Sequence, residues 1–182
     1  MNLLQKTGAI LATLACGFLP LSCAPSNSST DSKTPSNCLF DGTTRERTTP
    51  GGAFVTTVTL SQVSGTKRNC VDAVKWSFTP GLPGANVRYA SGPFTDTSGN
   101  PIKIEGAGLV VEFTGTSVGE PSDPARYVGP LTLSTSQLAH ITSATMQATT
   151  AGNMAWVLDI DKRRPFAVSA STMPAYFIIS IG

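Results

Sequence analysis

Apolar and polar side chains alternate along much of the chain beyond residue 53. Val74, Trp76 and Phe78 are separated by the single residues Lys75 and Ser77. Successive side chains of a β-strand point to opposite faces of a sheet, so a period of two predicts strands with one buried face. We predict strands in the segments 54–60, 74–78, 86–90, 102–105, 108–114, 131–134, 141–149, 154–159, 166–169 and 176–181.

Segments rich in glycine and proline separate these predicted strands. They lie at 79–84, 96–101 and 119–124, and they carry the residues that tight turns require. The best helical candidate is 136–144, where the serine and threonine content limits a helix to one turn. Many short strands between turns predict an all-β fold, a β-sandwich of two antiparallel sheets with little or no helix outside the signal segment.

The first 22 residues have the layout of a secretory signal peptide. One positive charge, Lys6, precedes an uncharged and mostly apolar run over residues 7–22. A transmembrane helix is the alternative, but the run is shorter than the roughly 20 residues that a span needs, and Pro20 interrupts it. We therefore predict an exported protein.

The residues that follow the apolar run indicate a lipid anchor. Leu19-Pro20-Leu21-Ser22-Cys23 resembles a bacterial lipobox, in which the cysteine is acylated and becomes the mature N-terminus. Cys16, after Thr13-Leu14-Ala15, is the alternative lipidation site. We predict a signal peptide at 1–22, a Ser/Thr/Pro-rich tether at 23–37 and a folded domain at 38–182. The protein would be anchored to the outer face of the cell membrane, or secreted if the lipobox is not used.

Two cysteines remain for the folded part of the chain, Cys38 and Cys70. Because disulfides form in the compartments that exported proteins enter, we predict that these two cysteines are bonded. A metal site is the alternative, but one histidine and two cysteines supply too few ligands for it.

The charge balance excludes one class of partner. The chain has 13 basic and 11 acidic residues, and charged residues make up 13% of it, about half the usual share. Binding to nucleic acid needs a concentrated basic surface, so we expect no nucleic-acid partner. No glycine-rich phosphate loop or nucleotide motif is present in the sequence, and we predict no cofactor.

The sequence offers no convincing catalytic centre. His140 is the only histidine, and we expect it to lie partly buried or at the surface. Asp159 and Asp161 flank one residue of a predicted strand, so their side chains point to the same side. Such a pair could hold a cation, or it could serve a glycosidase, which requires two nearby carboxylates. The basic run 162–164 follows directly, so charges that pair with one another explain these carboxylates more simply. We predict no catalytic residues and no metal site.

Four residues are candidates for ligand binding. Tyr127 lies beside Arg126 in a predicted loop, where it would stack on a sugar or, alternatively, anchor the loop. Arg163 and Arg164 carry guanidinium groups suited to carboxylates, with a solvated turn as the alternative. The two tryptophans, Trp76 and Trp156, lie among alternating apolar residues, and we predict that both are core residues.

An ordered set of motifs resembles the AMIN-like domain-containing lipoproteins of actinobacterial type. The motifs run from residue 53 to residue 182 and comprise Val71-Asp72-Ala73-Val74-Lys75-Trp76-Ser77-Phe78, Val87-Arg88-Tyr89, Ile104-Glu105-Gly106-Ala107-Gly108-Leu109-Val110-Val111-Glu112-Phe113, Met154-Ala155-Trp156-Val157-Leu158-Asp159-Ile160-Asp161, Arg164-Pro165-Phe166-Ala167-Val168 and Pro174-Ala175-Tyr176-Phe177-Ile178-Ile179. The family typically has Asp-Arg where this chain has Asp72-Ala73, so a role of that arginine does not carry over.

The resemblance implies a β-sandwich related to the AMIN domains, which direct amidases and secretin components to peptidoglycan. The leading hypothesis is therefore a non-catalytic envelope lipoprotein that binds cell-wall glycan or peptidoglycan, or that localises a partner there. A module that recruits or assembles another envelope protein is the alternative hypothesis. A hydrolase is the third, and the lack of a catalytic constellation argues against it.

Overall fold

The structure, a computed structural model, describes residues 39–51, 57–119, 126–147 and 152–182. These residues belong to a compact unit that spans Asn37–Gly182. They form strands and loops without a helix, which confirms the predicted all-β class. The strands are β1 (Arg47–Thr49), β2 (Val58–Arg68), β3 (Val71–Thr79), β4 (Gly84–Tyr89), β5 (Ala107–Thr114), β6 (Thr116–Ser117), β7 (Thr132–Leu133), β8 (Ile141–Gln147), β9 (Asn153–Ile160), β10 (Phe166–Thr172) and β11 (Ala175–Ile181).

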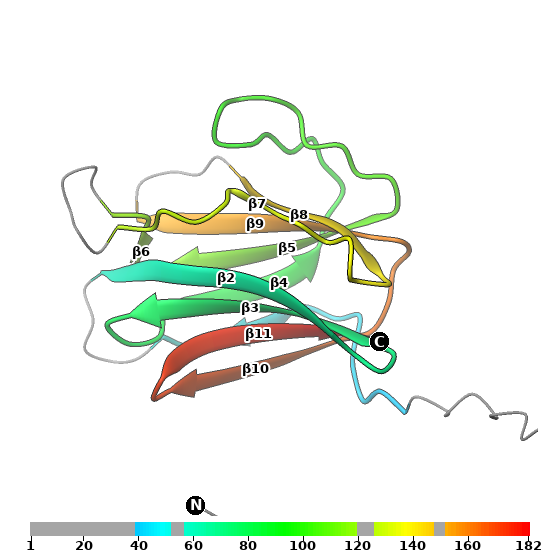
Figure 1. Cartoon of the computed structure of the whole chain (residues 1–182), viewed down its shortest axis with the longest axis horizontal. Helices are drawn as coiled ribbons and strands as arrows, with labels where there is room; N and C mark the ends of the chain where they lie inside the picture. Colours follow the sequence, from blue (N-terminus) through cyan, green and yellow to red (C-terminus); the bar gives the residue numbers. More distant parts are fainter. Residues whose placement is uncertain (1–38, 52–56, 120–125, 148–151) are drawn as a thin grey trace, which may run out of the picture. The chain divides into compact units, whose positions relative to one another are not determined.

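The strands form two sheets that pack face to face, so the predicted sandwich is confirmed (Figure 1). The six-stranded sheet has the order β1-β4-β5-β9-β8-β7, and the five-stranded sheet has the order β10-β11-β3-β2-β6. Neighbouring strands are antiparallel, except that β6 pairs with β2 in parallel. The chain passes from one sheet to the other between β9 and β10, and this crossover positions the candidate site.

Burial alternates along the strands as the sequence predicts. Val74, Trp76 and Phe78 of β3 point inward and are less than 5% exposed, whereas the residues between them are partly exposed. In the neighbouring strand Phe177 lies opposite Trp76, and Ile179 lies opposite Val74, so the inner faces of β3 and β11 coincide. The alternation of apolar and polar residues in the sequence therefore identifies the side chains that enter the core.

The central strand β9 departs from this alternation because it is covered on both faces. Each of its residues from Met154 to Ile160 is buried. Leu158 points into the main core, while Val157 joins Phe94 and Val110 in a second apolar cluster on the outside of the six-stranded sheet. The loop between β4 and β5, which stands out from the sandwich in Figure 1, supplies Phe94.

Aromatic rings join the two sheets in the middle of the sandwich. Phe113 of β5 contacts three rings of the opposite sheet, with centroid distances of 5.6 Å to Trp76, 5.0 Å to Phe78 and 5.3 Å to Phe177. Trp156 of β9 lies edge-on to Trp76 at 6.2 Å. Both tryptophans are 0% exposed, which confirms that they are core residues.

The structure corrects the predicted strand at 102–105. Ile102 and Ile104 alternate with polar residues, but they pack against the second cluster from a loop and pair with no strand. Two short strands, β1 and β6, were not predicted because they are polar and lack apolar alternation. Around Leu138, where one helical turn was the predicted limit, a single turn is closed by the Leu138 N–H donating to the Thr135 carbonyl at 2.8 Å.

Replacing the ring that joins the sheets tests this description of the core. We expect Phe113→Ala to lower the free energy of unfolding by about 3–5 kcal/mol, because the cavity removes contacts with both sheets. Urea denaturation followed by tryptophan fluorescence measures this change. Met173→Ala is the control, since Met173 is 91% exposed and should change stability by about 0.5 kcal/mol or less. Equal effects of the two substitutions would contradict the assignment of Phe113 to the core.

Candidate functional site

A cleft of about 530 Å³ opens where β4 ends and β5 begins. Residues 89–92 form one wall, residues 104 and 106–108 form the other, and Arg163 from the crossover between β9 and β10 completes the lining. Most wall residues are glycine or alanine, so the backbone is close to the open space. This volume lies in the range of sites that bind small molecules.

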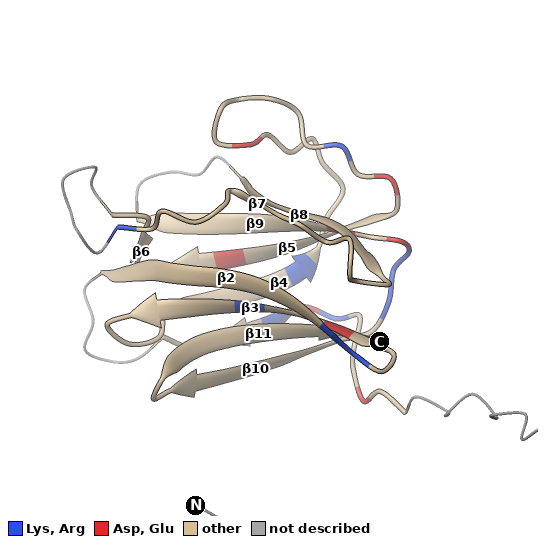
Figure 2. Ribbon diagram, viewed as in Figure 1, with Lys and Arg blue, Asp and Glu red and all other residues tan. Residues whose placement is uncertain are grey.

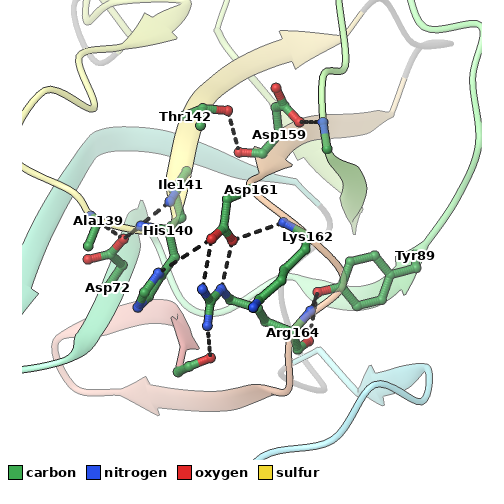
Figure 3. Close-up of polar contacts among 12 residues, drawn as sticks. Asp72, Tyr89, Ala139, His140, Ile141, Thr142, Asp159, Asp161, Lys162 and Arg164 are labelled. Carbon is green, nitrogen blue, oxygen red and sulfur yellow. Dashed lines mark hydrogen bonds and ion pairs between the residues drawn. The ribbon is translucent and has the colours of Figure 1, made fainter.

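Tyr89, the last residue of β4, clamps the crossover to the six-stranded sheet. Its hydroxyl donates to the Arg164 carbonyl at 2.7 Å and accepts from the Arg164 N–H at 3.0 Å (Figure 3). Its ring lies edge-on to Phe166 at 6.0 Å. Burial raises the pKa of Tyr89 above 10.0, so the hydroxyl stays protonated at neutral pH. The two hydrogen bonds hold the loop that carries both arginines.

Arg163 lies over Tyr89 at the mouth of the cleft. Its guanidinium carbon is 4.9 Å from the centroid of the Tyr89 ring, which is a cation–π contact. Its Nη2 donates to the Thr44 carbonyl at 3.2 Å. Among the residues that the structure describes, no acidic side chain forms an ion pair with Arg163. The exposed side chain is thus held in place while its charge stays uncompensated.

Arg164 has a different environment, because Asp161 neutralises it. Its Nε and Nη2 donate to the two oxygens of Asp161, each at 2.7 Å, and its Nη1 donates to the Gly182 carbonyl at 3.4 Å (Figure 3). These bonds lower the pKa of Asp161 and raise the pKa of Arg164. The prediction that charges in 161–164 pair with one another is confirmed for this pair.

Asp159 supports the wall of the cleft opposite Tyr89. Its carboxylate, 3% exposed, accepts the N–H groups of Glu105 and Gly106, each at 3.0 Å. A side chain on Gly106 would collide with the Ile160 carbonyl, so glycine lets the loop approach the end of β9. Asp159 therefore binds the loop before β5, and Asp161 binds Arg164 (Figure 3). Both carboxylates have structural roles.

Asp72 links the two sheets behind the crossover. Its Oδ2 accepts three backbone N–H groups from the segment that leads into β8, those of Ala139 at 2.7 Å, His140 at 2.5 Å and Ile141 at 3.2 Å. Asp72 is 0% exposed, so these bonds replace the water that Oδ2 loses on folding, while the buried Oδ1 has no hydrogen-bond partner among the described residues. The imidazole of His140 is partly buried, as predicted, with Nδ1 3.9 Å from Asp161 Oδ2.

The structure separates the four residues predicted to bind a ligand. Arg126 and Tyr127 follow β6, and β6 lies beside the beginning of β9. Arg163 and Arg164 follow the end of β9, which is about 20 Å from its beginning. Tyr127 is 8% exposed and donates its hydroxyl to the Pro130 carbonyl at 2.7 Å. This burial fits the loop-anchoring alternative and leaves little ring surface for a sugar.

Two contributors to the site were not among the predicted site residues. Tyr89 was placed in a predicted strand. The Gly92-Pro93 pair shortly after it is a local signal that the chain leaves the sheet there. Asp72 was noted only for its motif. Both act on residues 67–75 positions away in the sequence, and no local pattern reveals such partners.

Other predicted features lie outside or at the border of the described residues. Cys16, Cys23 and Cys38 are outside, so lipidation and the Cys38–Cys70 disulfide stay predictions. Within the described ranges there is no helix long and apolar enough to cross a membrane. The same ranges contain no group of three or more histidine, cysteine or acidic side chains placed to hold a metal ion.

Comparison with protein families gives one match. The family model for the AMIN-like domain matches residues 53–182, which include β2 to β11 and the whole cleft. The chain belongs to the AMIN-like domain family. AMIN-like domains are associated with the cell envelope and are typically non-catalytic binding modules. Comparisons with curated proteins and with solved structures gave no match.

The buried carboxylate of Asp72 allows a first test of how this AMIN-like domain holds its cleft. We expect Asp72→Ala to lower the free energy of unfolding by about 3 kcal/mol, because three backbone N–H groups lose their acceptor. Thermal or urea denaturation measures the loss. The exposed Asp41→Ala is the matched control and should be nearly neutral. A similar small effect for both variants would show that the Asp72 contacts contribute little.

The ion pair between Asp161 and Arg164 predicts a pH dependence. The folded-state pKa of Asp161 lies below its ordinary value of 3.8, so the pair stabilises the fold fully above that pH and loses its contribution as the pH falls through the lower folded value. We expect Asp161→Asn to cost about 1 kcal/mol at neutral pH, since solvent screens the partly exposed pair. The difference between wild type and variant should shrink when unfolding is measured at successively lower pH below 3.8. A difference that stays constant through that range would contradict the assignment.

Proposed function

We propose that this AMIN-like domain is a non-catalytic module that binds peptidoglycan at the cell envelope through the cleft that Tyr89 and Arg163 help to line. The observation that carries the proposal is the uncompensated cation that Tyr89 and Thr44 hold at the mouth of the cleft. The family match over residues 53–182 supports the location and the class of ligand. Cell-wall polysaccharide is included, since glycan and peptide belong to one polymer.

The predicted N-terminus completes this proposal. A signal peptide over residues 1–22, lipidation at Cys23 or Cys16 and a tether over residues 23–37 would hold the domain at the outer face of the membrane. The domain would then reach the wall from the membrane surface. Secretion without an anchor is the alternative if the lipobox is not used.

Several contacts argue against a hydrolase. A retaining or inverting glycosidase needs one carboxylic acid and one carboxylate facing a shared substrate. Asp159 instead accepts two backbone N–H groups, and Asp161 pairs with Arg164. Both carboxylates thus contribute to the structure, which supports a binding role for the cleft.

Binding of another envelope protein is the second candidate function, and the edge strand β10 favours it. Phe166 pairs with Thr43 through hydrogen bonds of 2.9 and 2.8 Å, but the remainder of this edge has no partner among the described residues. Residues 167–171 contain neither charge nor proline, the usual protection of an open edge. An extended segment of a partner would add to such an edge.

Sedimentation with purified peptidoglycan tests the proposed function. We expect the full chain to bind saturably and Arg163→Ala to weaken binding about tenfold, the effect of losing one charged hydrogen-bonded contact. Arg126→Ala is the matched control, because it removes an exposed arginine near the other end of β9 and should bind like wild type. If the folded chain fails to bind at any modest salt concentration, wall binding is wrong and the protein-binding alternative gains support, which in-cell crosslinking to one stoichiometric partner would establish.

A further inference from the structure

We infer that the group bound at Arg163 is a carboxylate, so that the cleft recognises the peptide stems of the wall and not its sugar rings. This inference rests on the proposed function and makes its ligand class specific. Four features of the cleft lead to it: the charge at its mouth, the geometry of the guanidinium, the state of the aromatic ring and the composition of the walls.

Among the described residues that line the cleft, one is a cation, and it forms no ion pair with a described acidic side chain. Arg164 is paired with Asp161, Arg88 is paired with Glu112 at 2.7 Å, and Lys103 is paired with Glu105 at 2.5 Å. Asp159 is buried and satisfied by backbone N–H groups, so its carboxylate does not face Arg163. Among the described residues that line the cleft, Arg163 is the charged one, and the site therefore carries a positive charge.

The geometry of Arg163 prepares it for a bidentate contact. A guanidinium carries five N–H donors in one plane, and the structure uses one Nη2 donor for the Thr44 carbonyl. The contact with Tyr89 and the hydrogen bond to Thr44 restrain the group, so less conformational entropy is lost on binding. The remaining donors match the two oxygens of a carboxylate.

The aromatic ring of the cleft is already occupied. Arg163 lies over the Tyr89 ring, Phe166 forms a T-shaped pair with this ring, and the Tyr89 hydroxyl is bonded to the Arg164 backbone. No other aromatic side chain lines the cleft within the described part of the chain. Stacking of a sugar needs an open aromatic face, and Arg163 already covers one face of the Tyr89 ring.

The walls suit a short peptide end. Gly92, Gly106 and Gly108 remove side chains from the lining, and Ser91 supplies an exposed hydroxyl. Backbone groups at such a surface can pair with the amide groups of a peptide that enters behind its carboxylate. Charge and shape thus indicate the same ligand, the carboxylate end of a peptide.

A pair of probes that differ in one group tests the inference. The purified full chain is titrated with N-acetyl-D-alanyl-D-alanine and with its C-terminal amide, and binding is followed by NMR through the Arg163 Nε–H signal. We expect the acid to bind about tenfold more tightly than the amide, since the amide loses a charged hydrogen-bonded pair. Equal binding of acid and amide, or no binding of either, would overturn the inference.

Two substitutions separate the charge from its geometry. Arg163→Gln should abolish the preference for the acid, and Arg163→Lys should retain part of it, because lysine keeps the charge and loses the planar fork. Arg126→Gln should behave like wild type. Unchanged thermal unfolding shows that each variant is folded, and an Arg163→Gln variant that still prefers the acid would contradict the role of this residue.

A second arm distinguishes failure of this inference from failure of the proposed function. The full chain is sedimented with native peptidoglycan and with peptidoglycan whose carboxylates have been converted to methylamides. Loss of binding to the amidated polymer supports both proposals. Equal binding to both polymers keeps wall binding and overturns the carboxylate inference. If neither polymer is bound while the acid probe still binds at Arg163, the cleft recognises a carboxylate and the wall is not its source.

Discussion

The contact of Phe113 with rings of the opposite sheet is the interaction on which the domain depends. Two sheets that meet across an apolar gap are free to slide unless side chains interlock. Phe113 enters between Trp76, Phe78 and Phe177, and this fixes β5 relative to β3 and β11. Because β5 is thereby fixed, so are its neighbours β4 and β9, whose ends carry Tyr89 and lead into Arg163. The candidate site is thus positioned by the core.

Charged residues have mostly local structural uses in this domain. Figure 2 shows that they are sparse on the strands, and several gather where loops leave the sheets at the end that carries the crossover. There Asp72, Asp159 and Asp161 each hold a different segment, the lead into β8, the wall before β5 and the basic loop. None of these three carboxylates pairs with Arg163, so the cation that lines the cleft is free to bind a ligand.

The sequence revealed the main strands because their inward faces obey a period of two, as in 74–78 and 176–181. The same signal misled at 102–105, since Ile102 and Ile104 are half-buried by a second cluster that belongs to a loop. For the site, the basic run was recognised, but its two arginines looked equivalent. Only the fold distinguishes them, because Asp161 takes Arg164 while Tyr89, 75 positions from Arg164, lies beneath Arg163.

The pairing of Thr43 with Phe166 determines how the domain would respond to mechanical tension. A pull applied at Thr43 would load the two backbone hydrogen bonds to Phe166, at the start of β10. The next residue, Thr44, holds Arg163. Tension would therefore reach the arginine at the cleft before it reached the aromatic core. Such a load would disturb the contact between Thr44 and Arg163 while the aromatic rings between the two sheets kept their packing.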